Sequence, residues 1–223
     1  MLNFIGCGSA FSQETNSCAY IIHRRKLLLL DCGENTFSKV KRLLDDNRIN
    51  EVNVCITHTH ADHVNGLSTL IFYLHFIKKI HVHIYVGSRK TMDSVNQLLS
   101  INGNHTDQYR IYTIETDFIQ IEEDLMVSFI KTKHVDEMDC FGFLIRYCDK
   151  NIYYSGDSLV IPSVVYNMIK NNKIDVLYQD IGSHYEGRVH MSLEDLQTYD
   201  FSNYNGKIFI YHNLEGELLE WRF

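Results

Sequence analysis

Apolar and polar positions follow two different periods along the chain. Short runs rich in Val, Ile, Leu and Tyr are bounded by Gly, Asn or Asp, a pattern typical of strands. Between these runs, apolar residues recur three and four positions apart, as on one face of a helix. In one such stretch the apolar positions are Leu67, Leu70, Ile71 and Leu74. The pattern therefore predicts that strands and helices follow one another through both halves of the chain.

The predicted elements cover most of the sequence. The predicted strands are Leu2–Ile5, Ala19–Ile22, Leu27–Leu30, Val52–Thr57, Val82–Val86, Arg110–Ile114, Met126–Thr132, Phe141–Tyr147, Ile152–Ser155, Ile174–Tyr178 and Lys207–Tyr211. The predicted helices are Asn35–Leu44, Leu67–Phe76, Thr91–Leu99, a helix from about Pro162 through Lys170, and a helix that Ser192–Asp195 opens as a capping box and that ends near Tyr199. This order predicts an α/β layered protein with its functional groups on loops at strand ends. Because no linker-like segment divides the chain, residues 1–223 are expected to form a single domain.

Composition narrows the classes of partner. The chain has 223 residues, of which 45% are hydrophobic, as expected for a globular protein with a real core. Its formal net charge is -7, and its longest basic cluster is the short segment His23–Lys26. An acidic chain without a basic face is a poor non-specific binder of nucleic acid or of anionic membranes. An anionic substrate would therefore need a local source of positive charge.

The cysteines and the N-terminal residues bear on location. The six cysteines form no CxxC pair, and several lie within apolar runs, which indicates buried, reduced thiols. The start of the chain, MLNFIGCGSA, lacks the pattern of a signal peptide. The longest apolar stretches, such as Leu27–Leu30, are too short to span a bilayer. We therefore expect a cytoplasmic protein without a membrane partner.

The segment THTHADHVNG places His58, His60, Asp62 and His63 directly after a predicted strand. In extended geometry the two histidines two positions apart point the same way and can reach one ion. The carboxylate and the third histidine can turn toward a second ion where a helix begins, and Gly66 is expected to let the backbone bend there. Imidazole and carboxylate ligands suit Zn²⁺, and manganese or iron is also compatible.

Six residues cannot close a metal site alone, so further ligands must come from later loops. Three candidates each follow a predicted strand: His134, Asp157 and His212. Each residue taken singly is more often a surface or capping residue. As an ordered set after the first motif, they indicate a metal site.

These residues, in this order, resemble the metallo-β-lactamase fold superfamily. The resemblance runs from Asn3 to about Asn213 and implies an α/β fold, a four-layer αβ/βα sandwich with metals at the edge between two sheets. It also implies two divalent metal ions. By position, one metal would be held by His58, His60 and His134, the other by Asp62, His63 and His212, and both by Asp157.

Further stretches resemble the branch that contains ribonuclease Z and its small-nucleotide phosphodiesterase relatives. They are IGCGSA at Ile5–Ala10, Asn16–Ser17, LLLLDCGENT at Leu27–Thr36, YQDIG at Tyr178–Gly182 and HMS at His190–Ser192. The resemblance implies that Asp180 orients His190 and that His190 protonates the leaving oxygen. The chain departs from the branch in that Asp180 replaces a Glu and Gln179 replaces a His.

The implied chemistry is hydrolysis of a phosphodiester by a hydroxide that bridges two metals, most simply Zn²⁺. The predicted catalytic residues are Asp62, His190 and Asp180. Two divalent ions, two aspartates and a hydroxide leave a local charge of about +1, which suits an anionic substrate. Ribonuclease Z usually grips tRNA with a basic arm between the third metal histidine and the bridging aspartate. Here His134 and Asp157 are 23 positions apart, which leaves no room for an arm and favours a small or cyclic nucleotide.

Three alternatives stay open at this point. The first is a ribonuclease Z-type endonuclease that processes the 3′ end of precursor tRNA, so RNA stays a candidate partner. The second is a lactone, thioester or lactam hydrolase, and the third is a binding protein without activity. Analogy with the branch suggests a homodimer. No role is assigned to His23, His75, His81, His83 or His105, and only a weak one, in contacting a base or phosphate, to Tyr185 and Arg188.

Overall fold

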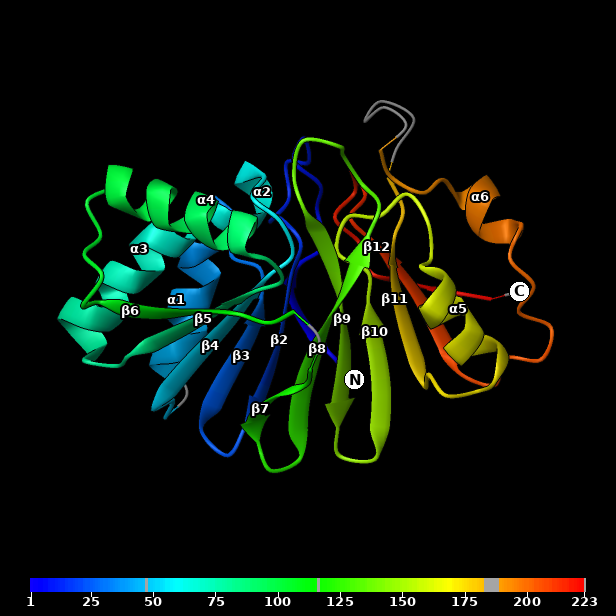
Figure 1. Ribbon diagram of the computed structural model, residues 1–223, viewed down its shortest axis with the longest axis horizontal. Coiled ribbons are helices and arrows are strands. Elements are labelled where there is room, and N and C mark those ends of the chain that lie inside the picture. Colours follow the sequence, from blue (N-terminus) through cyan, green and yellow to red (C-terminus); the bar gives the residue numbers. More distant parts are fainter. Residues whose placement is uncertain (47, 116, 183–188, 223) are drawn as a thin grey trace.

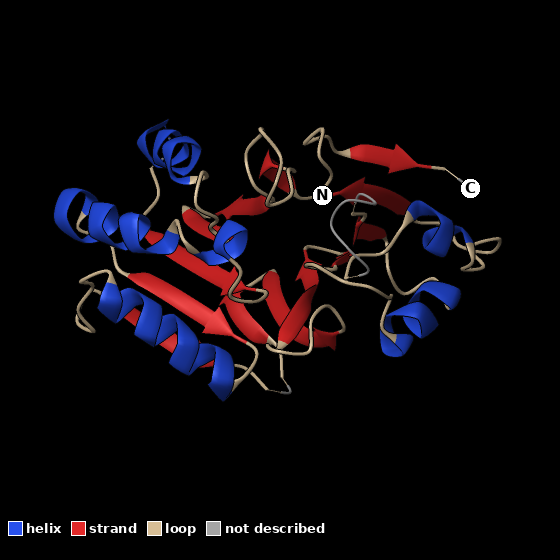
Figure 2. Cartoon of the chain, turned by 90° about the horizontal axis from the view of Figure 1, so that it is seen from above, coloured by secondary structure: helices blue, strands red, loops and turns tan. Residues whose placement is uncertain are grey.

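The chain folds into two β-sheets that face each other, with helices on their outer faces (Figures 1 and 2). The computed structural model describes residues 1–46, 48–115, 117–182 and 189–222. The four layers, helices, sheet, sheet and helices, confirm the predicted αβ/βα sandwich. Within the described ranges, no helix has the length and apolar character needed to cross a membrane.

The first sheet has the order β1-β2-β3-β4-β5-β6. Its strands β3 to β6 are parallel, whereas β1 to β3 are antiparallel. The bounds are β1 Asn3–Gly6, β2 Cys18–His23, β3 Lys26–Leu30, β4 Glu51–Ile56, β5 Val82–Val86 and β6 Tyr109–Thr113.

The second sheet has the order β13-β12-β11-β10-β9-β8-β7. Its three strands β10 to β12 are parallel, and the flanking pairs are antiparallel. The bounds are β7 Ile119–Glu122, β8 Leu125–Thr132, β9 Cys140–Tyr147, β10 Lys150–Tyr154, β11 Val176–Asp180, β12 Lys207–Tyr211 and β13 Leu219–Trp221.

The helices divide between the two outer faces. Helices α1, α3 and α4 and the π-helical segment η1 pack on the first sheet, and α5 and α6 pack on the second. Between the sheets lies a separate apolar layer to which strands of both contribute. The bounds are α1 Phe37–Asp46, α2 Ala61–Val64, α3 Leu67–Phe72, η1 Tyr73–Lys78, α4 Arg89–Ile101, α5 Ser163–Lys170 and α6 Leu193–Gln197.

Several local details differ from the sequence-based prediction. The short strands β7 and β13 were not predicted. The helix start expected at Asp62 and His63 is a separate short helix, α2, and the predicted helix Leu67–Phe76 is divided into α3 and η1. The strand predicted at Ile174–Tyr178 begins and ends two residues later, as β11. Gly66 has an ordinary right-handed helical φ of -75°, so it is not needed for a bend. A Cβ there would instead lie 2.2 Å from the carbonyl oxygen of Gly33, so the glycine permits close approach.

Other predictions agree closely with the structure. Helix α6 opens with the predicted capping box, in which Ser192 Oγ accepts from the backbone N–H of Asp195 and the Asp195 side chain accepts in return from the Ser192 backbone. Strand β12 has the predicted bounds. Strands β4, β8, β10 and β12 each end just before a predicted site residue, so the fold collects these residues at one edge of the two sheets.

Candidate metal centre

The motif after β4 turns around one close backbone contact. His58 and His60 lie in the short link between β4 and α2, and α2 itself carries Asp62 and His63. A Cβ on Gly33 would lie 1.9 Å from the carbonyl oxygen of Asp62, so only glycine lets the loop after β3 touch α2. This contact fixes where the helix starts, and with it the direction of its two ligand-type side chains.

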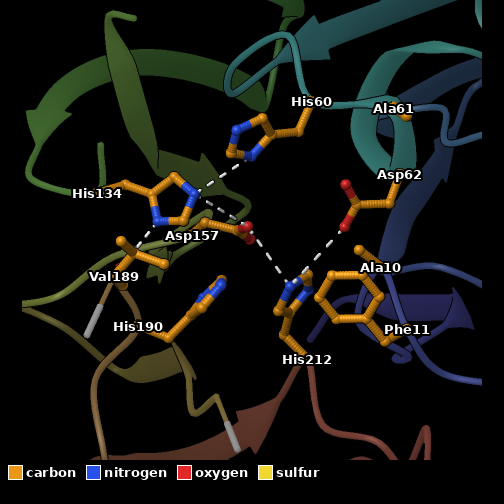
Figure 3. A pocket seen from close by; sticks show the side chains of 10 residues that line it. All are labelled: Ala10, Phe11, His60, Ala61, Asp62, His134, Asp157, Val189, His190 and His212. Atoms are coloured by element: carbon orange, nitrogen blue, oxygen red, sulfur yellow. Dashed lines mark hydrogen bonds and ion pairs between the residues drawn. The ribbon is translucent and has the colours of Figure 1, made fainter. Parts of the chain in front are cut away.

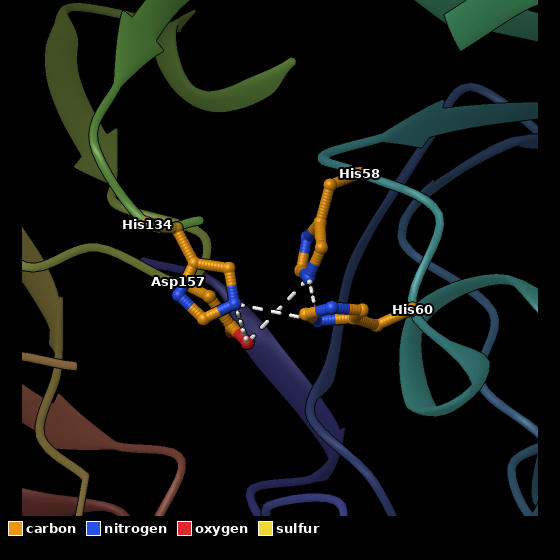
Figure 4. Close-up of side chains that lie close together, drawn as sticks. All are labelled: His58, His60, His134 and Asp157. Carbon is orange, nitrogen blue, oxygen red and sulfur yellow. Dashed lines mark hydrogen bonds and ion pairs between the residues drawn. The ribbon is translucent and has the colours of Figure 1, made fainter. Parts of the chain in front are cut away.

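The first group of side chains consists of His58, His60, His134 and Asp157 (Figure 4). Nδ1 of His60 lies 2.9 Å from Nε2 of His58 and 3.3 Å from Nε2 of His134. Oδ2 of Asp157 lies 3.6 Å from His58 Nε2 and 3.7 Å from His134 Nε2. Three imidazole nitrogens and a carboxylate oxygen thus converge on one small volume.

The second group consists of Asp62, His63, Asp157 and His212. Nε2 of His63 lies 3.1 Å from Asp157 Oδ1 and 3.3 Å from Asp62 Oδ2. Nε2 of His212 lies 3.4 Å from Asp157 Oδ2 and 3.9 Å from Asp62 Oδ2. Asp157 therefore belongs to both groups, and the structure brings together all seven residues that the sequence indicated as ligands.

The donor sets fit divalent metal ions. Nε2 of His63 and Oδ1 of Asp157 are buried and lie 3.1 Å apart, yet neither makes a hydrogen bond of good geometry within the part of the chain that the structure describes. A buried polar atom without a partner is unfavourable unless something else satisfies it. Imidazole nitrogens and carboxylate oxygens within coordination range of a common point are the ligand types of Zn²⁺ and similar cations. The protein is thus a binder of divalent metal.

One buried carboxylate, Asp31, organises two of the ligands from behind. Its Oδ2 accepts from Nδ1 of His63 at 2.8 Å and from Oγ1 of Thr57 at 2.8 Å. Thr57 Oγ1 in turn lies 3.0 Å from Nδ1 of His58. With its own proton donated to Asp31, the hydroxyl accepts from that imidazole. Both histidines then carry a proton on Nδ1, so Nε2 is the nitrogen that would bind a metal ion.

Two further histidines are held in the same way. Nδ1 of His134 lies 2.8 Å from the carbonyl oxygen of Val189, to which it donates. Nδ1 of His212 lies 3.1 Å from Oγ of Ser17, and this hydroxyl donates to the carbonyl of Gly8. Each partner leaves Nε2 available as a ligand atom. His60 differs, because it turns Nδ1 toward the first group.

Burial and charge set the protonation of the ligands. Burial lowers the pKa of His58 well below its usual value, and it also lowers those of His60 and His134. Burial opposes a charge on His63 too, but Asp157, Asp62 and Asp31 together raise its pKa well above the usual value. For Asp157, the opposing effect of burial is outweighed by the surrounding histidines, His212 first, and its pKa is well below the usual range. In the metal-free protein a proton on His63 therefore balances the carboxylates.

His190 and Asp180 form a pair beside the two groups. Nδ1 of His190 lies 2.7 Å from Oδ2 of Asp180, which also accepts from the backbone N–H of Ser158 at 2.8 Å. Asp180 is fully buried at the end of β11. Side-chain atoms of this pair, of Asp157 and of His212 lie within 4.8 Å of one another. The predicted acid pair is thus positioned directly against the metal ligands.

A cavity of about 300 Å³ opens onto these groups (Figure 3). Its described walls include His60, Asp62, His134, Asp157, His190 and His212, and its apolar walls are Ala10, Phe11, Ala61 and Val189. His134 and His190 lie on one side in this view, and Asp62 and Phe11 lie on the other. The site is therefore accessible to a small molecule.

Several site residues were not assigned a role from the sequence. Asp31, Thr57 and Ser17 act through histidines and lie in or beside apolar strands. A carboxylate directly after the run LLLL was a usable signal for Asp31, because a charge at a buried strand end needs a partner. The five histidines given no role are in none of the described ligand groups. Tyr185 and Arg188 lie outside the described residues.

Comparison with known proteins gives one matching family. A family model described as "Anti-Pycsar protein Apyc1" matches residues 1–218. Among curated relatives, the Anti-Pycsar protein Apyc1 of Bacillus phage 010DV004 is 27% identical over 234 residues, covering 95% of this chain and 88% of that protein. Ribonuclease Z of Sulfolobus acidocaldarius is 30% identical over 151 residues, covering 66% of this chain and 48% of that enzyme.

Solved structures give the fold. The short form of human tRNase Z has a TM-score of 0.75 at 18% identity and covers 100% of this chain and 99% of its own. The metallo-beta-lactamase fold protein YhfI from Bacillus subtilis has a TM-score of 0.70 at 17% identity and covers 99% and 98%. The resemblance to the metallo-β-lactamase fold and to its ribonuclease Z-like branch is confirmed.

Proposed function

The chain belongs to the Anti-Pycsar protein Apyc1 family, and from this premise we propose that it hydrolyses a small nucleotide phosphodiester, with a cyclic nucleotide as the favoured substrate, at a centre of two metal ions. With its family and its ribonuclease Z relative, it is a metal-dependent hydrolase of the phosphodiesterase type. The ligand groups combine residues from both sheets, and one apolar layer joins these sheets, which supports treating residues 1–223 as one catalytic domain.

One observation carries the proposal: Asp157 is shared by two ligand groups, and an acid pair lies against both. His58, His60 and His134 would hold one ion, Asp62, His63 and His212 the other, and Asp157 would contact both. Divalent cations bound to these residues would supply an activated water as nucleophile and would neutralise the charge that develops on a phosphoryl group. Zn²⁺ suits these ligands best, and manganese or iron is compatible with them.

The chain's own residues supply the proton. With Nδ1 of His190 bonded to Asp180, the other ring nitrogen, Nε2, is the one that gives a proton to the departing alkoxide. Asp180 keeps the ring in that orientation and stabilises its protonated form. Asp62 lies across the cavity from His190, where it would help to hold the second ion and to orient the attacking water.

The size and lining of the site support a small substrate. Strands β9 and β10 form a tight hairpin joined by only Cys148 and Asp149, so no arm projects between His134 and Asp157. The described residues around the cavity include neither Lys nor Arg. Among the described walls, attraction for a substrate phosphate would come from bound metal ions, with little along a longer backbone. This favours a mononucleotide over precursor tRNA.

The test is hydrolysis of nucleoside 3′,5′-cyclic monophosphates by metal-loaded protein, beside the variants His190→Ala and Asp157→Asn. We expect His190→Ala to lose at least about 100-fold in kcat, the lower range for loss of a general acid. Asp157→Asn, which removes a residue shared by both ligand groups, should lose at least as much. His83→Ala and Asp175→Asn are matched controls, because they remove the same groups far from the ligand groups. Retention of wild-type kcat by His190→Ala would contradict the assignment of the acid.

A ribonuclease Z-type endonuclease is the second candidate, and the identity to ribonuclease Z of Sulfolobus acidocaldarius favours it. Site-specific cleavage of precursor tRNA at its 3′ trailer, faster than cyclic nucleotide hydrolysis, would establish it. The same variants separate a lactone, thioester or lactam hydrolase, since turnover of those substrates without dependence on His190 would mark that chemistry.

A further inference from the structure

Phe11 is an exposed aromatic residue at the mouth of the metal cavity. Its side chain is 74% exposed, yet it lines the same cavity as Asp62 and His212. In the view of Figure 3 its ring lies on the same side of the cavity as Asp62, across from His190. Single exposed apolar residues are common on protein surfaces, so exposure alone carries no argument. Phe11 differs from such residues in its position at the cavity and in the hydrogen-bonded turn that holds its backbone.

The backbone around Phe11 is fixed by hydrogen bonds. Ala10 and Phe11 are the central residues of a tight turn in which the N–H of Ser12 donates to the carbonyl of Ser9 at 3.2 Å. The N–H of Gly8 donates to the carbonyl of Thr15 at 2.9 Å and closes the loop at its base. The ring is thus displayed on a defined turn rather than on a long free loop.

The same turn is tied to the segment that carries His212. Oγ of Ser12 donates to the carbonyl of Leu214 at 2.8 Å, and the N–H of Ser9 donates to the carbonyl of Asn213 at 3.3 Å. The backbone of the turn is therefore coupled to the metal ligand next to Asn213. The position of Phe11 relative to the second ligand group is set by the fold.

The remaining described walls offer little else to hold a nucleobase. The other apolar lining residues are Ala10, Ala61 and Val189, which are small, and the rest are the ligands and the acid. No other phenylalanine, tyrosine or tryptophan lies among the described lining residues. With the phosphate held at the ligand groups, a base joined to it through the sugar would extend away from them, toward the exposed side of the cavity where Phe11 lies.

We infer that Phe11 is the stacking platform for the nucleobase of the substrate, an inference that rests on the proposed phosphodiesterase function. Stacking of a base on an aromatic ring contributes about 1–3 kcal/mol and tolerates every base, because each has a π-face. The interaction also needs no charged side chain, in agreement with a cavity whose described walls lack Lys and Arg. Phe11 would therefore select for a base without selecting strongly among bases.

The test compares two ligands that share a phosphate and differ in the base. Binding of AMP and of ribose 5-phosphate to the metal-loaded protein is measured by calorimetry, and the ratio of the two Kd values reports the base. We expect wild type to bind AMP about 5- to 150-fold more tightly, the range expected for one stack. In Phe11→Ala this ratio should fall to about 1–2, and in Phe11→Trp it should persist.

Phe76→Ala is the matched control, because that ring is also exposed, at 54%, but lies on η1 away from the cavity. A ratio that is unchanged in Phe11→Ala, or absent in wild type, would overturn the inference. The proposed function fails separately. Wild type that binds AMP through Phe11 but hydrolyses no phosphodiester supports the platform and contradicts the phosphodiesterase.

Discussion

Replacing Asp31 by asparagine is expected to weaken metal binding although Asp31 contacts no metal. The carboxylate is fully buried and accepts three hydrogen bonds of 2.8 Å, from the backbone N–H of Thr57, from its hydroxyl and from Nδ1 of His63. Its φ of 66° lies in the left-handed region, which asparagine tolerates better than most residues. The substitution therefore changes the acceptor chemistry and leaves the backbone in place.

The magnitude follows from counting donors. One oxygen of the carboxylate faces Thr57 N–H, and the other faces both the Thr57 hydroxyl and His63. In either orientation, the amide group of the substituted side chain places an N–H against at least one of these donors. A buried donor left without an acceptor costs about 1–3 kcal/mol in the free energy of unfolding. The unsatisfied donor could be removed if the proton of His63 moved from Nδ1 to Nε2. Nε2 would then have no lone pair for the metal, and we expect metal affinity to fall about 10- to 100-fold.

The assay is competition for Zn²⁺ between the protein and a chelating indicator, with Tm measured on the metal-free protein. Asp175→Asn is the matched control, because Asp175 also accepts a backbone N–H at 2.8 Å, from Asn151, and is outside the ligand groups. We expect Asp31→Asn to lower affinity while Asp175→Asn leaves it unchanged. Equal Zn²⁺ affinity of Asp31→Asn and wild type would refute the view that this carboxylate orients the ligands.

Three other outcomes are expected. Because the pKa of His63 is raised in the fold, its protonation stabilises the metal-free protein at a pH below the unfolded pKa of about 6.5, and this stabilisation is lost as pH rises through the folded pKa. The Tm of protein treated with a chelator should therefore fall as pH rises above about 7. Over the same range the affinity for Zn²⁺ should rise, and Zn²⁺ binding should release protons that a weakly buffered solution reports. Gly33→Ala should lower both Tm and metal content, because the added Cβ would lie 1.9 Å from the carbonyl oxygen of Asp62. The control is Gly103→Ala, whose added Cβ would have no atom within 4 Å. This variant should lower Tm by a few degrees at most and keep its full metal content, measured by elemental analysis. A thiol reagent should label Cys148 rapidly in the native protein and all six cysteines after unfolding, because the other five are buried and burial raises their pKa; rapid native labelling of a second thiol would contradict this.

The elements that sequence pattern predicted best are those with strong local signals. Strand β12 has its predicted bounds, and α6 begins at the predicted capping box. Strand β11 shows the limit of the method: its last residues, Gln179 and Asp180, are polar yet fully buried, so an apolar pattern ends the strand too early. The short strands β7 and β13 exist through pairing with β8 and β12, and with four and three residues they are too short to show a clear apolar period of their own.

The residues of the site also fall into those that the sequence can predict and those that it cannot. Histidines and aspartates directly after apolar strands are unusual, so the residues that present ligand atoms can be found from residue type and spacing, as for the group around Asp157. Residues that act through others are ordinary in the sequence. Ser17 and Thr57 become informative only when the fold places a hydroxyl against an imidazole nitrogen. Gly33 likewise gains its meaning from a contact with Asp62, 29 positions away, and not from its neighbours in the chain.

The division of the ligands between the two sheets has a consequence for how such proteins diverge. The first sheet contributes His58, His60, Asp62 and His63, and the second contributes His134, Asp157 and His212. Neither the segment ending at β6 nor the one beginning at β7 holds a complete site. Recombination between relatives at that junction therefore yields an active chimera only where the inherited apolar layers match in thickness. Selection on catalysis thus acts on side chains between the sheets that never approach the substrate.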